Sequence, residues 1–106
     1  MKQTILKLNE SLKTNLEEQE TINNELNNLP KGHINTLYRN GKGYYYLTYR
    51  NGKKINNDYL GPVGKVDLGE ILDKLNQRAK LKKQLKEYKK EEVKINKSIK
   101  KANDIS

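Results

Sequence analysis

A tyrosine-rich segment in the middle of the chain constrains the fold more than any other feature. Five of the seven tyrosines lie between Tyr44 and Tyr59, and the sequence contains no Phe or Trp. The dipeptide Asn51-Gly52 interrupts this segment, and it favours a type I′ turn because both residues tolerate positive φ. Aromatic and β-branched residues on either side of such a turn are typical of a β-hairpin. The centre of the chain is therefore predicted to form antiparallel strands.

Glycines and prolines divide the central region into three expected strands, at residues 33–39, 44–50 and 53–60, with a glycine-rich loop at 40–43. The turn at Asn51-Gly52 predicts that Arg50 pairs with Lys53, and that Tyr44 pairs with Tyr59. Because side chains alternate along a strand, the residues divide between two faces. We expect Tyr44, Tyr46, Ile55 and Tyr59 to face the helices, and Tyr45, Tyr49 and Lys54 to face outward.

The segment before the strands, residues 3–29, has the pattern of a helix. Its apolar residues follow the a and d positions of a heptad, namely Ile5, Leu8, Leu12, Ile22, Leu26 and Leu29. Asn15 and Gln19 occupy the same track. Polar residues at such positions weaken the apolar seam, but they restrict its register or the number of partners.

A second helix is expected at residues 67–101, followed by a tail at 102–106. Asp67 can cap this helix, with Glu70 at capping-box spacing. The break near residues 78–80 separates two apolar tracks and indicates a stutter or a bend. The first track holds Leu68, Leu72 and Leu75, and the second holds Leu81, Leu85, Tyr88, Ile95 and Ile99.

Charge is distributed unevenly over the 106 residues. The net charge is +9, but residues 1–29 carry three Lys and five Glu, whereas residues 30–66 carry seven Lys or Arg and one Asp. Pairing an acidic first helix with a basic second helix matches both charge and apolar seam. We therefore expect one elongated α+β domain over residues 1–106, with the helices paired as an antiparallel coiled coil and the sheet at one end. A homodimer through the second helix is the alternative, opposed by like-charge repulsion.

Several classes of function are disfavoured by composition. Hydrophobic residues make up 33% of the chain, below the usual 45–50% or so, so we expect a thin core. There is no cysteine for a disulfide or thiolate site, and no apolar run long enough for a membrane span. His33 is the single histidine, and no catalytic or metal-ligand spacing surrounds it. We expect a cytoplasmic protein that is not an enzyme and binds no cofactor or metal.

The basic charge of the strands points instead to a polyanionic partner. A small sheet fits the major groove of DNA, where Arg and Lys contact phosphates, and tyrosines can stack on unpaired bases. The candidate binding residues are Arg39, Lys42, Tyr45, Tyr49, Arg50, Lys53 and Lys54. A second basic stripe, on the last helix, contains Lys82, Lys83, Lys86, Lys89 and Lys90.

Residues 29–32, 44–54 and 59–61 together resemble a family of short uncharacterised proteins from phages and mobile elements of Gram-positive bacteria. The resemblance implies a tyrosine-rich sheet between two charged helices and a mobile-element context. More weakly, the order of three strands and a helix is similar to the arm-binding domains of tyrosine recombinases, which dock a three-stranded sheet in the DNA major groove.

The leading hypothesis is a non-enzymatic protein that binds DNA, RNA or a nucleic-acid–protein complex in a bacterial host cell. A second hypothesis is a phage-encoded, anti-CRISPR-like inhibitor that binds a host defence nuclease such as a Cas effector, or its guide-RNA complex. A third is a coiled-coil adaptor.

Overall fold

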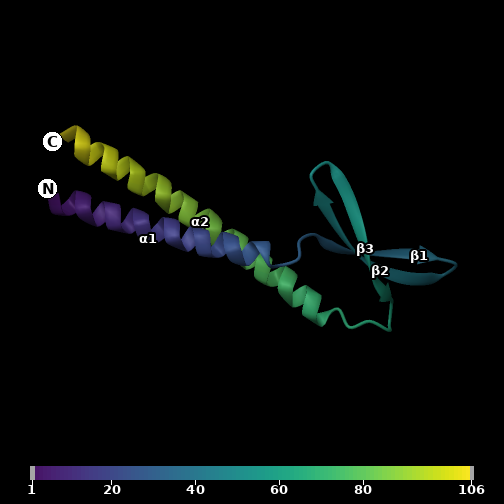
Figure 1. Ribbon diagram of the computed structural model, residues 1–106. Coiled ribbons are helices and arrows are strands. Elements are labelled where there is room, and N and C mark those ends of the chain that lie inside the picture. The colour runs from purple at the N-terminus through teal and green to yellow at the C-terminus, as the bar shows by residue number, and fades with distance from the viewer. Residues whose placement is uncertain (1, 106) are drawn as a thin grey trace. The chain divides into compact units, whose positions relative to one another are not determined.

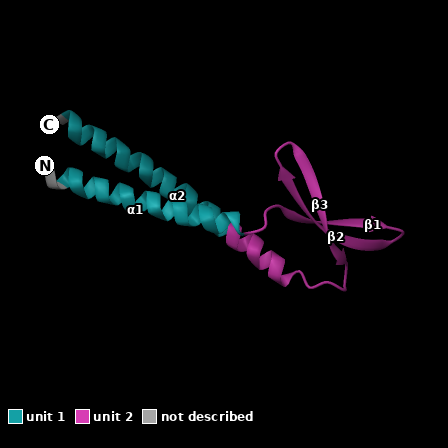
Figure 2. Ribbon diagram, viewed as in Figure 1, with its two compact units in different colours: residues 1–28, 79–106 teal, residues 29–78 magenta. Residues whose placement is uncertain are grey.

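The computed structural model describes the backbone of residues 2–105 and the side chains of residues 4–104. The chain is α+β, as predicted, and its three-stranded antiparallel sheet lies between two helices in sequence (Figure 1). The chain divides into two compact units (Figure 2). The helical unit contains residues 1–28 and 79–106, and the sheet unit contains residues 29–78. The elements are α1 (Lys2–Asn27), β1 (His33–Arg39), β2 (Lys42–Asn51), β3 (Lys54–Pro62) and α2 (Gly69–Ile105).

In the helical unit, α1 runs antiparallel to the second part of α2 (Figure 1). The residues buried along α1 follow the predicted heptad track, with Ile22 and Leu26 as its apolar members. Leu81 and Ile95 are the buried apolar residues of α2, and both belong to its predicted second track. The thin apolar seam expected from the sequence is therefore confirmed.

Polar residues occupy the middle of this seam. Asn15 is only 2% exposed, and Gln19 is also buried. The Asn15 side-chain amide donates a hydrogen bond to the Tyr88 carbonyl oxygen at 2.9 Å. The Gln19 amide donates to Asn15 Oδ1 and to Glu92 Oε1, each at 2.6 Å. Because a buried polar group is costly only when it is unpaired, this network joins the helices without an unsatisfied amide.

The first turn of α2 has the predicted cap, since Asp67 Oδ1 accepts a hydrogen bond from the Gly69 backbone at 2.8 Å. Of the predicted first apolar track, Leu68 and Leu75 are half-buried. The prediction is wrong for Leu72, because it is exposed and Ile71 is half-buried in its place. The helix also continues to Ile105 through the segment expected to be a tail, since no glycine or proline interrupts it.

The β1–β2 hairpin has a tighter turn than the glycine-rich loop expected at residues 40–43. Asn40 and Gly41 alone form it, with φ of 53° and 76°, and Arg39 pairs with Lys42. Positive φ at both central residues is the requirement of a type I′ turn. Strand β1 has its predicted bounds, whereas β2 begins at Lys42, two residues earlier than predicted.

The β2–β3 register differs from the prediction by two residues. Arg50 pairs with Ile55, and Asn51 pairs with Lys54, so the turn is Gly52-Lys53. Of the turn residues, Gly52 alone has positive φ, at 65°, as a type II′ turn requires. A bulge between Tyr45 and Tyr46 adds one residue to β3. Strand β3 consequently extends to Pro62.

The expected burial of the two sheet faces is wrong for part of each face, since Tyr44, Tyr45, Tyr46 and Tyr49 are all half-buried. An error of two residues keeps each side chain on its predicted face, but Ile55 is 62% exposed and Tyr59 is 56% exposed. Leu47, on the other face with Tyr45 and Tyr49, is 7% exposed. We call the side with Tyr44, Tyr46 and Tyr59 the open face, and the side with Tyr45, Leu47 and Tyr49 the covered face.

The segments that lead into and out of the sheet lie against the covered face. Gly32 approaches the Thr48 carbonyl so closely that a side chain there would collide with it. After β3, Val63 packs where a Gly43 side chain would lie, and its amide donates to the Gly43 carbonyl at 2.9 Å. Val66 fills the corresponding space at Gly61. These contacts cover part of this face with backbone and with the side chains of Val63 and Val66.

A polar ladder crosses all three strands on the open face. The Asn35 amide donates to Thr48 Oγ1 at 2.8 Å, and Thr48 Oγ1 donates to Asn57 Oδ1 at 2.6 Å. Thr48 is buried between its two partners. This ladder joins β1, β2 and β3 through the Thr48 hydroxyl, which is both an acceptor and a donor.

Thr48→Val keeps the shape of this side chain but removes the hydroxyl. We expect the free energy of unfolding to fall by about 1–2 kcal/mol, because two hydrogen bonds are lost and both amides need new partners. Thr36→Val, at an exposed position of β1, is the matched control and should change stability little. Urea unfolding followed by near-ultraviolet circular dichroism of the tyrosines measures the difference. Equal stability of the two variants would show that the ladder contributes nothing.

Candidate functional site

The open face combines aromatic and cationic side chains. Arg39, Lys42 and Arg50 lie on it together with Tyr44, Tyr46 and Tyr59, as the strand register and side-chain alternation require. Asp58, the one acidic residue of the three strands, pairs with Leu47 and belongs to the covered face. The open face therefore presents positive charge without a carboxylate to neutralise it.

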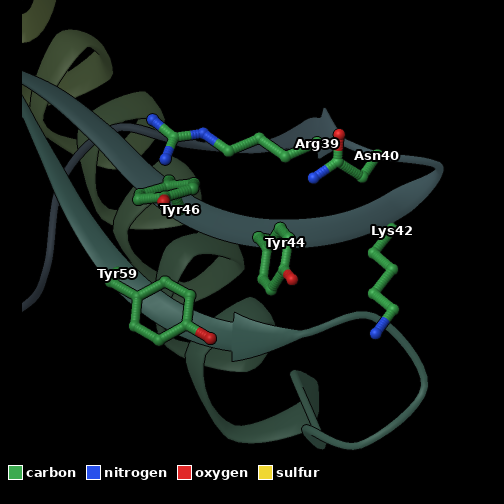
Figure 3. A pocket seen from close by; sticks show the side chains of 6 residues that line it. All are labelled: Arg39, Asn40, Lys42, Tyr44, Tyr46 and Tyr59. Carbon is green, nitrogen blue, oxygen red and sulfur yellow. The ribbon is translucent and has the colours of Figure 1, made fainter.

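Six residues of this face and its turn line a shallow pocket of about 440 Å³ (Figure 3). Tyr59 lies 5.4 Å from Tyr46 and 6.3 Å from Tyr44 between ring centroids, with both ring pairs tilted. In Figure 3 the Arg39 side chain extends toward Tyr46, and Lys42 stands at the hairpin end beside Tyr44. The lining residues are Arg39, Asn40, Lys42, Tyr44, Tyr46 and Tyr59.

Local backbone features account for this grouping. The two-residue turn at Asn40-Gly41 makes Arg39 and Lys42 direct cross-strand neighbours, and both side chains line the pocket. The Gly52-Lys53 turn sets the register in which Tyr59 pairs with Tyr46. The β3 bulge beyond that pair places Pro62 opposite Tyr44, and bulges commonly re-aim the side chains next to them. The pocket floor is thus a three-ring cluster held by one strand pair.

The residues expected to bind a partner do not form one cluster. Arg39 and Lys42 lie at the first end of β2, whereas Arg50, Lys53 and Lys54 lie at its other end. Lys42 and Arg50 are separated along the strand by at most about 26 Å, from the rise of one strand residue. The basic tip at residues 50–54 is therefore a separate surface from the tyrosine pocket.

The two tyrosines expected to face outward have other surroundings. Tyr45 and Tyr49 are half-buried on the covered face, and the Lys31 ammonium lies 6.0 Å from the centroid of the Tyr49 ring, within the range of a cation–π contact. The tyrosines that line the pocket were instead assigned to the helices. The dipeptide Asn40-Gly41 was the available signal, because a second type I′ turn would have placed Arg39 and Lys42 together.

The second basic stripe lies on the helical unit. Its five lysines, Lys82, Lys83, Lys86, Lys89 and Lys90, are all exposed on α2. Four of them surround a shallow hollow of about 490 Å³ that also includes Leu85 and Val93. Lys90 forms an exposed ion pair with Glu87 at 3.8 Å, a type of contact that contributes little to stability.

Other kinds of site are not found in the part of the chain that the structure describes. No group of three or more His, Asp or Glu residues there is placed to hold a metal ion. None of the described helices is long and apolar enough to cross a membrane. Comparison of the chain with protein-family models, with curated proteins and with solved structures gives no match.

Proposed function

We propose that this protein binds nucleic acid through the open face of its sheet, and that it acts by binding without catalysis. The observation that supports this proposal is a sheet face with three cations, one exposed tyrosine and two half-buried tyrosines, with the one strand carboxylate on the opposite face. Phosphates attract Arg and Lys, and the flat aromatic rings offer surfaces for bases. The cytoplasm of a bacterial cell, where both DNA and RNA are accessible, is the proposed location.

The helical unit of this protein is not required to contact the nucleic acid directly. The lysines of α2 add long-range attraction, since a chain of net charge +9 accumulates polyanions near its surface. This attraction does not depend on sequence and weakens as salt rises. Specific contact is assigned to the sheet, where cations and rings occur side by side.

The test removes the two cations at the pocket rim. We expect Arg39→Gln with Lys42→Gln to weaken binding of a fluorescent oligonucleotide at least about tenfold at 100 mM salt, and to lower the salt slope by about 0.7 per lost phosphate contact. Lys53→Gln with Lys54→Gln is the matched control, because it removes the same charge at the opposite end of β2. Fluorescence anisotropy over a salt series measures both quantities.

The control pair should retain most of the affinity. Equal loss in the two double variants would mean that overall charge, and not the open face, determines binding. Absence of binding to DNA and RNA of any form at 100 mM salt would overturn the proposed function.

A further inference from the structure

We infer that the tyrosine pocket of the open face takes one unpaired base of a single-stranded nucleic acid, with Arg39 and Lys42 contacting the phosphates on the two sides of that base. This inference rests on the proposed function and narrows its ligand from nucleic acid in general to unpaired strands. The pocket volume of about 440 Å³ falls within the usual size range of small-ligand sites, about 300–1,000 Å³.

The ring geometry favours stacking. Tyr44 and Tyr46 each make a tilted contact with Tyr59, so the three rings support one another. Tyr59 nevertheless remains 56% exposed, which leaves part of its ring available to a flat ligand. Paired bases within a duplex are stacked on one another and present only their edges in the grooves. An aromatic cluster recessed in a pocket therefore matches a base that is free of the stack.

The polar groups at the rim fit the remainder of a nucleotide. Arg39 extends toward Tyr46, and Lys42 lies beside Tyr44 at the hairpin end (Figure 3). The phosphates on the two sides of a stacked base would lie near these cations. Asn40, in the turn between them, also lines the pocket. Its side-chain amide can donate to and accept from a base edge. The pocket thus offers cations for phosphates, an amide for a base edge and rings for a base face.

The rest of the open face offers polar contacts for the neighbouring nucleotides of the bound nucleic-acid strand. Beyond the rings lies the ladder of Asn35, Thr48 and Asn57, and Arg50 stands at the far end of β2. A second cation along the same face would contact a phosphate several nucleotides away. The face is then long enough for a footprint of about four nucleotides, at the lower end of known single-strand sites.

Four probes test this inference with the whole chain: a single-stranded DNA, an RNA of the same sequence, the matching duplex, and a single strand of abasic nucleotides. We expect the wild type to prefer the two base-bearing single strands over the duplex and the abasic strand by about tenfold, the scale of one base–aromatic stack. Comparison of the DNA and RNA arms tells which sugar the site accepts.

Substitution of Tyr59 localises the effect. Tyr59→Leu should reduce single-strand affinity about tenfold while leaving duplex affinity unchanged, and Tyr59→Phe should restore it because the ring is kept. Tyr38→Leu is the matched control, since Tyr38 is 72% exposed on the opposite face of the sheet. Near-ultraviolet circular dichroism verifies that each variant is folded.

The outcomes separate this inference from the proposed function. Equal affinity for the duplex, the abasic strand and the base-bearing strands, or an equal effect of Tyr59→Leu and Tyr38→Leu, would overturn the base pocket even if the rim cations still matter. Loss of binding to every probe would overturn both.

Discussion

Gly32→Ala is expected to unfold the sheet unit of this protein. Gly32 has φ of 107°, in a region that L-residues with a side chain rarely adopt, and a Cβ there would collide with the Thr48 carbonyl group. It would also come within 2.9 Å of Tyr49 Cβ. Neither obstacle can rotate away, because one is backbone and the other is the first atom of its side chain. We expect a loss of about 3 kcal/mol or more from strain and overpacking.

A unit of this size has only a few kcal/mol of stability to lose, so near-ultraviolet tyrosine signals should be weak or absent at 25 °C. Gly64→Ala is the matched control: Gly64 also has positive φ, at 85°, but no atom lies near its Cβ position. That variant should lose only about 1–2 kcal/mol. Equal midpoints of urea unfolding in the two variants would contradict close packing of Gly32 against β2.

Asn15→Leu combined with Gln19→Leu is expected to make the helical unit more stable and less specific. Both side chains are buried in the seam, and replacing buried polar groups by apolar ones is often stabilising, by about 1–4 kcal/mol. The polar network of Asn15, Gln19 and Glu92 allows only one alignment of the helices. An all-apolar seam does not restrict the helices to one alignment, so other registers and chain pairings become accessible.

Thermal unfolding followed at 222 nm measures the gain in stability, and sedimentation equilibrium measures the number of chains. The control is Asn9→Leu with Asn23→Leu, which adds the same groups at exposed positions of α1. A double variant at Asn15 and Gln19 that melts below the wild type would mean that the network is a net source of stability. A variant that stays in one register and one assembly state would rule out its role in specificity.

The helices and strands could be predicted from the sequence because their residue patterns repeat over several turns, or because glycine and turn residues mark their ends. The heptad track of α1 extends over several turns, so Asn15 and Gln19 were recognised as seam positions despite being polar. Asp67 was identified as a cap from its capping-box spacing to Glu70, and in the structure its carboxylate accepts a hydrogen bond from the Gly69 backbone amide. Strand β1 is bounded by Gly32 and by the Asn40-Gly41 turn.

The register of the strands and the burial of the two sheet faces were harder to predict from the sequence. Asn51-Gly52 supports two turn types that differ by one residue in position, and the structure adopts the one in which Gly52 comes first. The bulge at Leu60 has no composition signal. Both faces carry tyrosines, so burial depended on Val63 and Val66, which lie outside the strands and pack over Gly43 and Gly61.

The composition of the candidate site depends on the same two properties, the strand register and the burial of the sheet faces. Arg39, Lys42 and Arg50 were singled out by charge, and they do share the open face. Tyr44, Tyr46 and Tyr59 were set aside because they were expected to be buried, although their cross-strand grouping had been noted from alternation. Composition indicates which residue types can bind a polyanion, but only the register indicates which of them are neighbours.

Strand β2 belongs to both hairpins and ends in a two-residue turn at each side. Inserting one residue within it would rotate every following side chain to the other face and would move the pocket rings against the covering valines. Insertions at Gly52-Lys53, an exposed turn far from the pocket, leave that alternation intact. This turn is therefore the natural attachment point for a fluorophore or an affinity handle on the working protein.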